Sequence, residues 1–363
     1  MKALLITNKG VEETAALEIG EILGKKPVVG ETVLSFSATP QELCKLSYKT
    51  QSAKRVVLLL KEQELSKVDD LQMDVDLTKY IFGDTFVVDC ERIGDQDFKS
   101  VDIESKLISI IAKAYDKKLS HDRPDTSFFA YVYGGKFYFG LDIGGDLQKR
   151  SYKIYSVTNS LKGQIAYDLV RESGFTKKDS LLVTSCRDGI VGIEAGYFAS
   201  GKAVRFFDKD KFPFWNYNFV DESYLTDLDG KEEKTKIVAV DGSAHNVTVA
   251  KKNAKIAGVE KVIKMSMMDL QWLDTKFDEG SVDRVIGHLP SVSKHRDEKQ
   301  TAKLFKEFFY QVSFILSKKG RIVTLTPKPD LLEEVAKEYK IKKIKEKILA
   351  QGQSNYTLMV WSK

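Results

Sequence analysis

Three polar side chains stand at or near the ends of apolar, strand-like runs in the C-terminal half of this chain. Asp241 and His288 follow such runs closely, and Asp269 comes shortly after a third. An aspartate at a strand end can accept two hydrogen bonds from ribose hydroxyls, and a neutral imidazole can accept one. Because ligands of open α/β sheets bind outside the carboxyl ends of the strands, these positions indicate a nucleotide-type ligand site. The structural alternatives are a helix-capping Asp241 and a histidine without a chemical role.

A turn that contains glycine separates a strand-like run from a helical run within residues 181–195, LLVTSCRDGIVGIEA. A nucleotide-type cofactor needs glycines at such a turn, so that the backbone can approach it closely. Gly189 meets this need, and Cys186 lies in the same turn. The turn is therefore a second candidate contact for a cofactor.

Lys149, Arg150 and Lys153 form a basic cluster beside Tyr152. Lysine and arginine bind phosphates, so such a cluster can mark a surface for nucleic acid. The whole chain carries 57 basic and 52 acidic residues, a formal net charge of +5, which permits nucleic-acid binding without demanding it. The alternative is the solvated basic edge of a small α/β domain.

The composition is that of a folded protein with more than one domain. With 363 residues, of which 42% are hydrophobic and 30% charged, the chain can bury two or three cores and is not disordered. Its three scattered cysteines argue against a disulfide framework or a zinc site and favour a reducing cytoplasm. No apolar run reaches the ~18 residues of a membrane span, and the first residues lack a secretory pattern.

The elements that must position these residues fall into blocks of an α/β protein. Residues 1–68 read as strand, helix, strand, helix, strand, and residues 69–147 form a second small α/β block. A short polar linker, 148–163, leads to residues 164–363, in which helices and strands alternate. This alternation predicts a right-handed, doubly wound sheet that ends in an antiparallel pair of strands.

The second block resembles the THUMP domain of RNA-modifying enzymes. The string E-R-x-G-x-x-x-F-x-S at residues 91–100 precedes a helix, and two strand-like runs flank a tight turn at Gly134-Gly135. The string L-x-K-R-x-Y at residues 147–152 closes the block. The first block resembles the ferredoxin-like module that precedes THUMP in many methylases. These resemblances imply RNA, most often tRNA, as the partner and the basic cluster as its contact.

The third block resembles the UPF0020 family of RNA methylases, which have the Rossmann-like class I fold and use S-adenosylmethionine. The turn within 181–195 is similar to the family loop L-L-D-P-x-C-G-S-G-T-x-x-I-E-A, although Arg187 replaces one of its glycines. The helix after Asp241 carries the family string A-K-x-N-A-x-x-A-G-V. The resemblance implies that four residues bind S-adenosylmethionine: Cys186, Gly189, Asp241, and Asp269 near the adenine amine.

The motif at 288–291 is similar to the family signature N-P-P-Y, whose asparagine accepts a hydrogen bond from an exocyclic amine while the tyrosine stacks on the base. His288, Leu289, Pro290 and Ser291 occupy the four positions here. The resemblance implies a catalytic site at His288, Leu289 and Pro290, with a neutral imidazole as the acceptor. An imidazole with an ordinary pKa near 6.5 would lose that role as the pH falls.

Two functions of different classes follow from these motifs. The first is a methyltransferase that moves a methyl group from S-adenosylmethionine to the guanine N2 amine of tRNA, with the base flipped into the pocket. The second is a non-catalytic RNA-binding protein that keeps the methyltransferase fold and acts as a partner or chaperone. The intact helix after Asp241 favours the first, and the departures at Arg187 and Ser291 favour the second.

Overall fold

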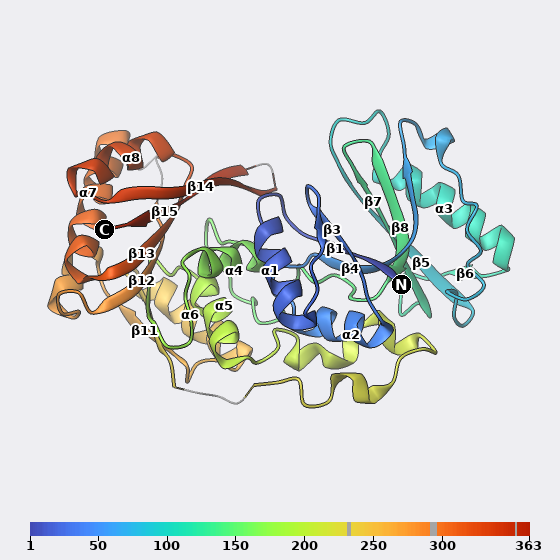
Figure 1. The fold of residues 1–363 in the computed structure, drawn as a ribbon, viewed down its shortest axis with the longest axis horizontal. Helices are drawn as coiled ribbons and strands as arrows, with labels where there is room; N and C mark the ends of the chain where they lie inside the picture. The colour runs from blue at the N-terminus through green and yellow to red at the C-terminus, as the bar shows by residue number, and fades with distance from the viewer. Residues whose placement is uncertain (231–233, 291–295, 353) are drawn as a thin grey trace. The chain divides into compact units, whose positions relative to one another are not determined.

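The computed structural model describes residues 1–230, 234–290, 296–352 and 354–363. The chain forms two compact units, each assembled from separate stretches of sequence (Figure 1). Unit 1 comprises Met1–Ile6, Ala16–Leu147 and Arg205–Leu228, and unit 2 comprises Thr7–Ala15, Gln148–Val204 and Asp229–Lys363. Each unit is built on one sheet with helices, so the predicted α/β class is confirmed.

Unit 1 contains an eight-stranded sheet with the order β2-β3-β1-β4-β8-β7-β5-β6. Its strands are β1 (Lys2–Ile6), β2 (Val28–Val29), β3 (Val33–Ser37), β4 (Arg55–Glu64), β5 (Thr85–Ile93), β6 (Lys118–Leu119), β7 (Thr126–Tyr133) and β8 (Lys136–Asp142). Its helices are α1 (Glu12–Leu23), which begins in unit 2, α2 (Pro40–Lys49), α3 (Ser100–Tyr115) and the short η1 (Val68–Asp70). Because β4 pairs with β8, the blocks predicted as 1–68 and 69–147 share one continuous sheet.

Local sequence explains several elements of unit 1. Thr39 caps α2 and Glu42 reaches back to the Thr39 backbone, and Pro40 occupies the first turn, where its missing N–H costs nothing. Gly134 and Gly135 have φ angles of 58° and 82°, which L-residues rarely adopt, and they join β7 to β8. The predicted tight hairpin at this glycine pair is therefore confirmed.

Residues 205–228 leave the third block of the sequence and join unit 1. They form three short 3₁₀ helices, η2 (Phe206–Lys211), η3 (Pro213–Asn216) and η4 (Glu222–Leu225). Tyr217 is buried, stacks on Phe82 with ring centroids 4.9 Å apart, and donates a hydrogen bond to the Asp142 carbonyl at 2.7 Å. Phe214 is fully buried in the same segment. The predicted continuous block 164–363 thus contains an aromatic insertion that completes the core of the other unit.

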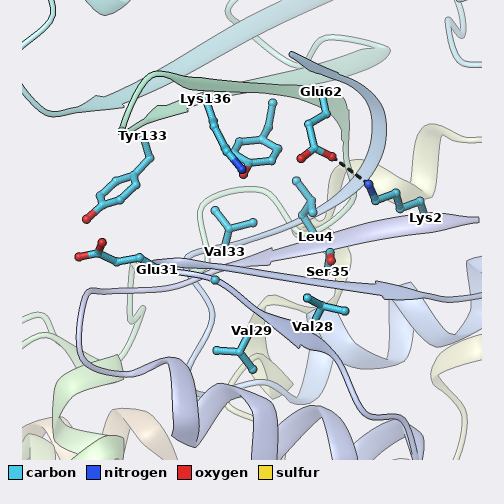
Figure 2. A pocket seen from close by; sticks show the side chains of 13 residues that line it. Lys2, Leu4, Val28, Val29, Glu31, Val33, Ser35, Glu62, Tyr133 and Lys136 are labelled. Atoms are coloured by element: carbon cyan, nitrogen blue, oxygen red, sulfur yellow. Dashed lines mark hydrogen bonds and ion pairs between the residues drawn. The ribbon is translucent and has the colours of Figure 1, made fainter. Parts of the chain in front are cut away.

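A pocket of about 430 Å³ lies on the sheet of unit 1 (Figure 2). Strands β1 to β3 contribute apolar side chains to it, and the β7–β8 hairpin contributes Tyr133 and Tyr138. Its charged side chains balance, since two lysines face two glutamates and Lys2 pairs with Glu62 at 2.8 Å. The pocket therefore has no charge preference for an anionic ligand.

Unit 2 contains a seven-stranded sheet with the order β11-β10-β9-β12-β13-β15-β14. The strands are β9 (Ser180–Thr184), β10 (Lys236–Asp241), β11 (Ile263–Met267), β12 (Val282–His288), β13 (Leu316–Thr326), β14 (Lys342–Gln351) and β15 (Ser354–Ser362). The first five in this order run parallel, and β15 pairs antiparallel with both β13 and β14. The predicted doubly wound sheet with a reversed edge is confirmed.

Helices cover both faces of the sheet of unit 2. They are α4 (Gly163–Glu172), α5 (Ile190–Ser200), α6 (Ala244–Ala257), α7 (Glu298–Ile315) and α8 (Pro329–Glu338), with the short η5 (Leu270–Thr275). Alternate residues of β9 divide between two buried clusters: Leu181 and Val183 pack with α4, α5 and α6, whereas Leu182 packs with α7 and α8. Within the described residues, none of the helices has the length and apolar composition needed to cross a membrane.

Candidate active site

The parallel strands of unit 2 bring the predicted site residues to one edge of the sheet. In the strand register Asp241 lies beside Met267, and Thr184 lies beside both Val240 and Gly287. The turn after β9, Asp241 at the end of β10 and His288 at the end of β12 therefore share the carboxyl edge. This is the edge at which ligands of such sheets bind.

Asp241 is buried and organises the turn after β9. Its Oδ2 accepts a hydrogen bond from the Arg187 backbone N–H at 2.9 Å, and its Oδ1 accepts from the Ser243 N–H and the Asn246 side chain. Oδ1 already accepts two hydrogen bonds, whereas Oδ2 accepts only one and has a further lone pair, so one acceptor site remains for a ribose hydroxyl. Asp241 can therefore hold the turn after β9 and still accept a hydrogen bond from a ribose hydroxyl.

The turn after β9 has the backbone conformation of a glycine-rich loop, although it contains few glycines. Ser185 and Arg187 both have φ of 52°, and Gly189 has φ of 84° where α5 begins. A Cβ on Gly189 would lie 2.9 Å from the Cβ of Ala250, so this glycine permits the close approach of α5 and α6. The Cys186 side chain lies in the buried apolar cluster, and burial raises the pKa of its thiol to about 12. Cys186 can therefore contribute to a pocket only through its backbone.

Asp269 lies close to the end of β10. It is exposed and precedes η5, and a Cβ on Gly242 would be 3.9 Å from its Cγ. Gly242 follows Asp241 directly, so the two carboxylates flank an open stretch of backbone. An exposed carboxylate beside a ribose site can accept a hydrogen bond from an adenine amine, as predicted for Asp269.

His288 lies in a second pocket, of about 350 Å³, at the same edge. The lining residues are Asn159, Arg187, His288, Leu289, Pro327, Ser354, Asn355 and Tyr356. Burial and the neighbouring Arg187 cation lower the pKa of His288 to about 3. The imidazole is therefore neutral at physiological pH, as the predicted acceptor role requires, and the ordinary value near 6.5 does not apply to it.

The other predicted motif residues differ in whether they line this pocket. Leu289 is buried and lines it, whereas Pro290 is half-buried and is not among the lining residues. Ser291 lies outside the described residues. The aromatic face that the sequence motif lacks comes instead from Tyr356 of β15, whose ring centroid is 6.0 Å from that of His288 at an angle of 82°.

The linker 148–163 is part of this site rather than a simple connection. Asn159 lines the pocket, and the Thr158 carbonyl accepts a hydrogen bond from Arg187 Nη1 at 3.1 Å. The Gln351 side chain near the β14–β15 turn bonds to the Ser160 carbonyl and the Lys162 N–H at 3.1 and 2.7 Å. These contacts fix the linker and the hairpin against each other and so position Tyr356. Sequence periodicity gave no signal for Asn159 or Tyr356.

The basic cluster does not form one surface. Lys149 is exposed, but Arg150 is buried, and its guanidinium donates to Glu194 at 2.6 Å from Nε and 3.3 Å from Nη2. Lys153 is half-buried and donates to the Leu161 carbonyl at 2.7 Å, with the carboxylate of Asp188 3.9 Å away. In this structure Arg150 cannot reach a phosphate, which corrects the prediction for that residue, and Lys153 is partly engaged within unit 2.

The residues at this edge fit an S-adenosyl cofactor by their chemistry. Asp241 retains acceptor capacity, Asp269 is exposed, and Gly242 between them has no side chain to obstruct a nucleoside. The pocket at His288 adds a cation and an aromatic ring next to the same turn. Among the described residues, no group of histidine, cysteine and acidic side chains could hold a metal ion.

Comparisons with known proteins agree with this architecture. Residues 150–356 match the family described as UPF0020, RMKL-like, methyltransferase domain. A tRNA (guanine(6)-N2)-methyltransferase of Methanocaldococcus jannaschii is 25% identical over 346 residues, which cover 90% of each protein. TrmN from Thermus thermophilus is 18% identical with a TM-score of 0.73, covering 100% of this chain and 99% of that one. SMU.472, a putative methyltransferase complexed with SAH, is 20% identical with a TM-score of 0.82, covering 99% and 97%.

The family match spans more than half of the chain, so the protein belongs to the UPF0020 family of methyltransferase domains. The structural matches extend over both units and, with the family match, confirm the predicted Rossmann-like methyltransferase fold behind a second α/β unit, whereas the THUMP domain stays a prediction.

Proposed function

We propose that this protein is an RNA methyltransferase that uses S-adenosylmethionine to methylate the N2 amine of a guanine in tRNA. The observation that carries the proposal is the neutral His288 imidazole in a pocket at the carboxyl edge, beside the turn that Asp241 organises. The bound cofactor would supply an electrophilic methyl group. The name of the relative from Methanocaldococcus jannaschii supports guanine N2 and tRNA as the target.

The chain's own groups would hold the cofactor and orient the base. Asp241 and Asp269 would bind the ribose and the adenine amine, while the backbone from Cys186 to Gly189 would approach the remainder of the cofactor. A neutral His288 would accept a hydrogen bond from the target amine, and the Tyr356 ring would give the flipped base a stacking surface. Such positioning of reactants is a large source of rate enhancement.

The proposal also covers location and domain roles. Residues 69–147 would form the THUMP domain and, with the ferredoxin-like block 1–68, would bind structured RNA, as their sequence motifs imply. The linker 148–163 and the block 164–363 would form the methyltransferase domain, with residues 205–228 packed on unit 1. We propose a cytoplasmic location, because none of the three cysteines forms a disulfide and RNA is the substrate.

The proposed activity is tested by calorimetric titration with S-adenosylmethionine and by transfer of a labelled methyl group to unmodified tRNA, followed by digestion to nucleosides. We expect binding, and label in N2-methylguanosine. In Asp241→Ala, loss of charge-assisted hydrogen bonds of about 1.5–3 kcal/mol should weaken binding about tenfold or more. Glu338→Ala, at a half-exposed residue that pairs with Lys306 and does not line the pocket, is the matched control for loss of a carboxylate.

Three results would contradict parts of this proposal. Folded Asp241→Ala that binds the cofactor like the wild type would remove the ribose assignment. Label in a nucleoside other than N2-methylguanosine would exclude guanine N2. A wild type that binds tRNA but neither binds nor uses the cofactor would establish the non-catalytic RNA-binding alternative.

Lys149 is the exposed member of the basic cluster, so we expect Lys149→Gln to weaken tRNA binding at low salt. Removal of one phosphate contact should reduce the slope of log affinity against log salt by about 1. The control is Lys178→Gln, the same charge change at an exposed residue before the amino end of β9, away from the ligand edge. Filter-binding titrations at several salt concentrations measure both slopes. Equal slopes for the two variants would remove Lys149 from the RNA contact.

A further inference from the structure

Arg187 stands where the family loop has a glycine, and the backbone keeps the glycine-like conformation there. Its φ is 52°, in the left-handed region, where a residue with a side chain is disfavoured by about 1–2 kcal/mol. The hydrogen bond from its backbone N–H to Asp241 holds this conformation at 2.9 Å. As a result, the Arg187 side chain lines the pocket together with His288 and Tyr356.

The guanidinium of Arg187 is only partly satisfied by the described residues. Nη1 donates to the Thr158 carbonyl at 3.1 Å, whereas Nε is buried and has no hydrogen-bond partner among them. No carboxylate in the described part of the chain forms an ion pair with this guanidinium, although Asp241 and Asp188 lie near enough to stabilise its charge. Arg187 is half-buried, and arginines that lose contact with water are normally paired with an anion.

The edge of the guanidinium opposite Nη1 has a specific chemistry. Nε and Nη2 present two parallel N–H groups on the side away from Nη1, and this edge matches the two oxygens of a carboxylate. Thr158 occupies Nη1, and on the bidentate edge the buried Nε has no hydrogen-bond partner in the described structure. Arg187 is also the only cationic side chain among the described residues that line the pocket.

We propose that the Arg187 side chain binds the carboxylate of the cofactor's amino-acid half. It would replace a contact that a glycine-rich loop makes through its backbone. This inference rests on the proposed use of S-adenosylmethionine. Asp241 and Asp269 would then hold the adenosine half, and Arg187 the opposite end. The replacement of glycine by arginine would thus change how the cofactor is held while retaining the site.

The test compares S-adenosylhomocysteine with its decarboxylated analogue, which differs only in the carboxylate, by calorimetric titration. The wild type should bind S-adenosylhomocysteine about tenfold or more tightly than the analogue, because a charge-assisted pair is lost with the carboxylate. Arg187→Gly, which fits the left-handed backbone without strain, should abolish that preference. Arg187→Lys should retain part of it, since it keeps the charge and loses the fork.

Arg296→Gln is the matched control, because Arg296 also raises the positive potential near Arg187 but does not line the pocket. It should leave the preference intact. Three results with Arg187→Gly would overturn the assignment. An undiminished preference would exclude the carboxylate contact, and tighter binding of both ligands would make Arg187 an obstruction. Weaker tRNA binding with unchanged S-adenosylhomocysteine binding would make the anion bound by Arg187 an RNA phosphate. A wild type that binds neither small ligand would instead overturn the proposed function itself.

Discussion

Replacement of Glu194 by alanine is expected to lower the free energy of unfolding by about 3–5 kcal/mol. Glu194 is fully buried in α5, and it accepts hydrogen bonds from Arg150 at 2.6 and 3.3 Å and from the Tyr152 hydroxyl at 2.6 Å. Removal of the carboxylate leaves the Arg150 charge without its buried counter-charge, and it removes the acceptor of the Tyr152 hydroxyl. Urea denaturation, followed by circular dichroism, measures the change.

Two further variants separate the ion pair from the cavity that alanine creates. Glu194→Gln keeps most of the volume and some acceptor capacity, so it should lose less stability than Glu194→Ala. The double variant Arg150→Met, Glu194→Met should also be more stable than Glu194→Ala, since no buried charge is left unpaired. Glu338→Ala breaks a half-exposed ion pair with Lys306 and should change stability little. A loss in Glu194→Ala no larger than in Glu338→Ala would refute the role of the buried pair.

Replacement of His288 by alanine should lower the rate of methyl transfer by about 10²-fold, on the scale of a misplaced reacting group, and leave cofactor affinity nearly unchanged. The expected cause is loss of the acceptor that orients the target amine. His288→Asn supplies an amide oxygen, as the family motif does, and should keep or raise the rate. Single-turnover transfer to unmodified tRNA measures these rates. Equal rates for wild type and His288→Ala would exclude a catalytic role.

The pH dependence gives an independent reading of His288. Burial, and then Arg187, depress its pKa to about 3, so the imidazole stays neutral as the pH falls through 6.5. The transfer rate of the wild type should therefore show no step near pH 6.5 that is caused by His288. In this pH range its profile should match that of His288→Asn. A step of that kind would mean that the imidazole is solvated and titrates normally.

The sequence predicted those parts of the molecule that depend on local pattern. Alternating helices and strands indicated the doubly wound sheet, Gly134-Gly135 indicated a hairpin, and strand ends indicated that Asp241 and His288 lie at the same edge of the sheet. Each of these predictions needs only the period of the apolar residues or the backbone preference of a glycine. The strand register then brings distant residues to the same edge without any further information.

The parts that the sequence did not predict depend on partners far away in the chain. The sequence pattern predicted Arg150 as part of a basic surface, but its partner Glu194 lies 44 residues further on and can be found only in the folded structure. Tyr356 enters the site because β15 returns beside β13, and Asn159 because the linker bonds to Gln351. Charge and periodicity do not specify such pairings.

Because residues 205–228 belong to unit 1, they limit how this protein can be divided or recombined. A shortened chain that began at Gln148 would carry this segment without the sheet that buries Phe214 and Tyr217. Aromatic side chains of this size bury about 150–250 Å² each, so at about 25 cal/mol per Å² their exposure would cost several kcal/mol and favour aggregation. An exchange of N-terminal units between relatives must therefore carry two distant pieces of sequence together. Unit 1 is discontinuous in sequence, and a single recombination crossover cannot transfer it intact.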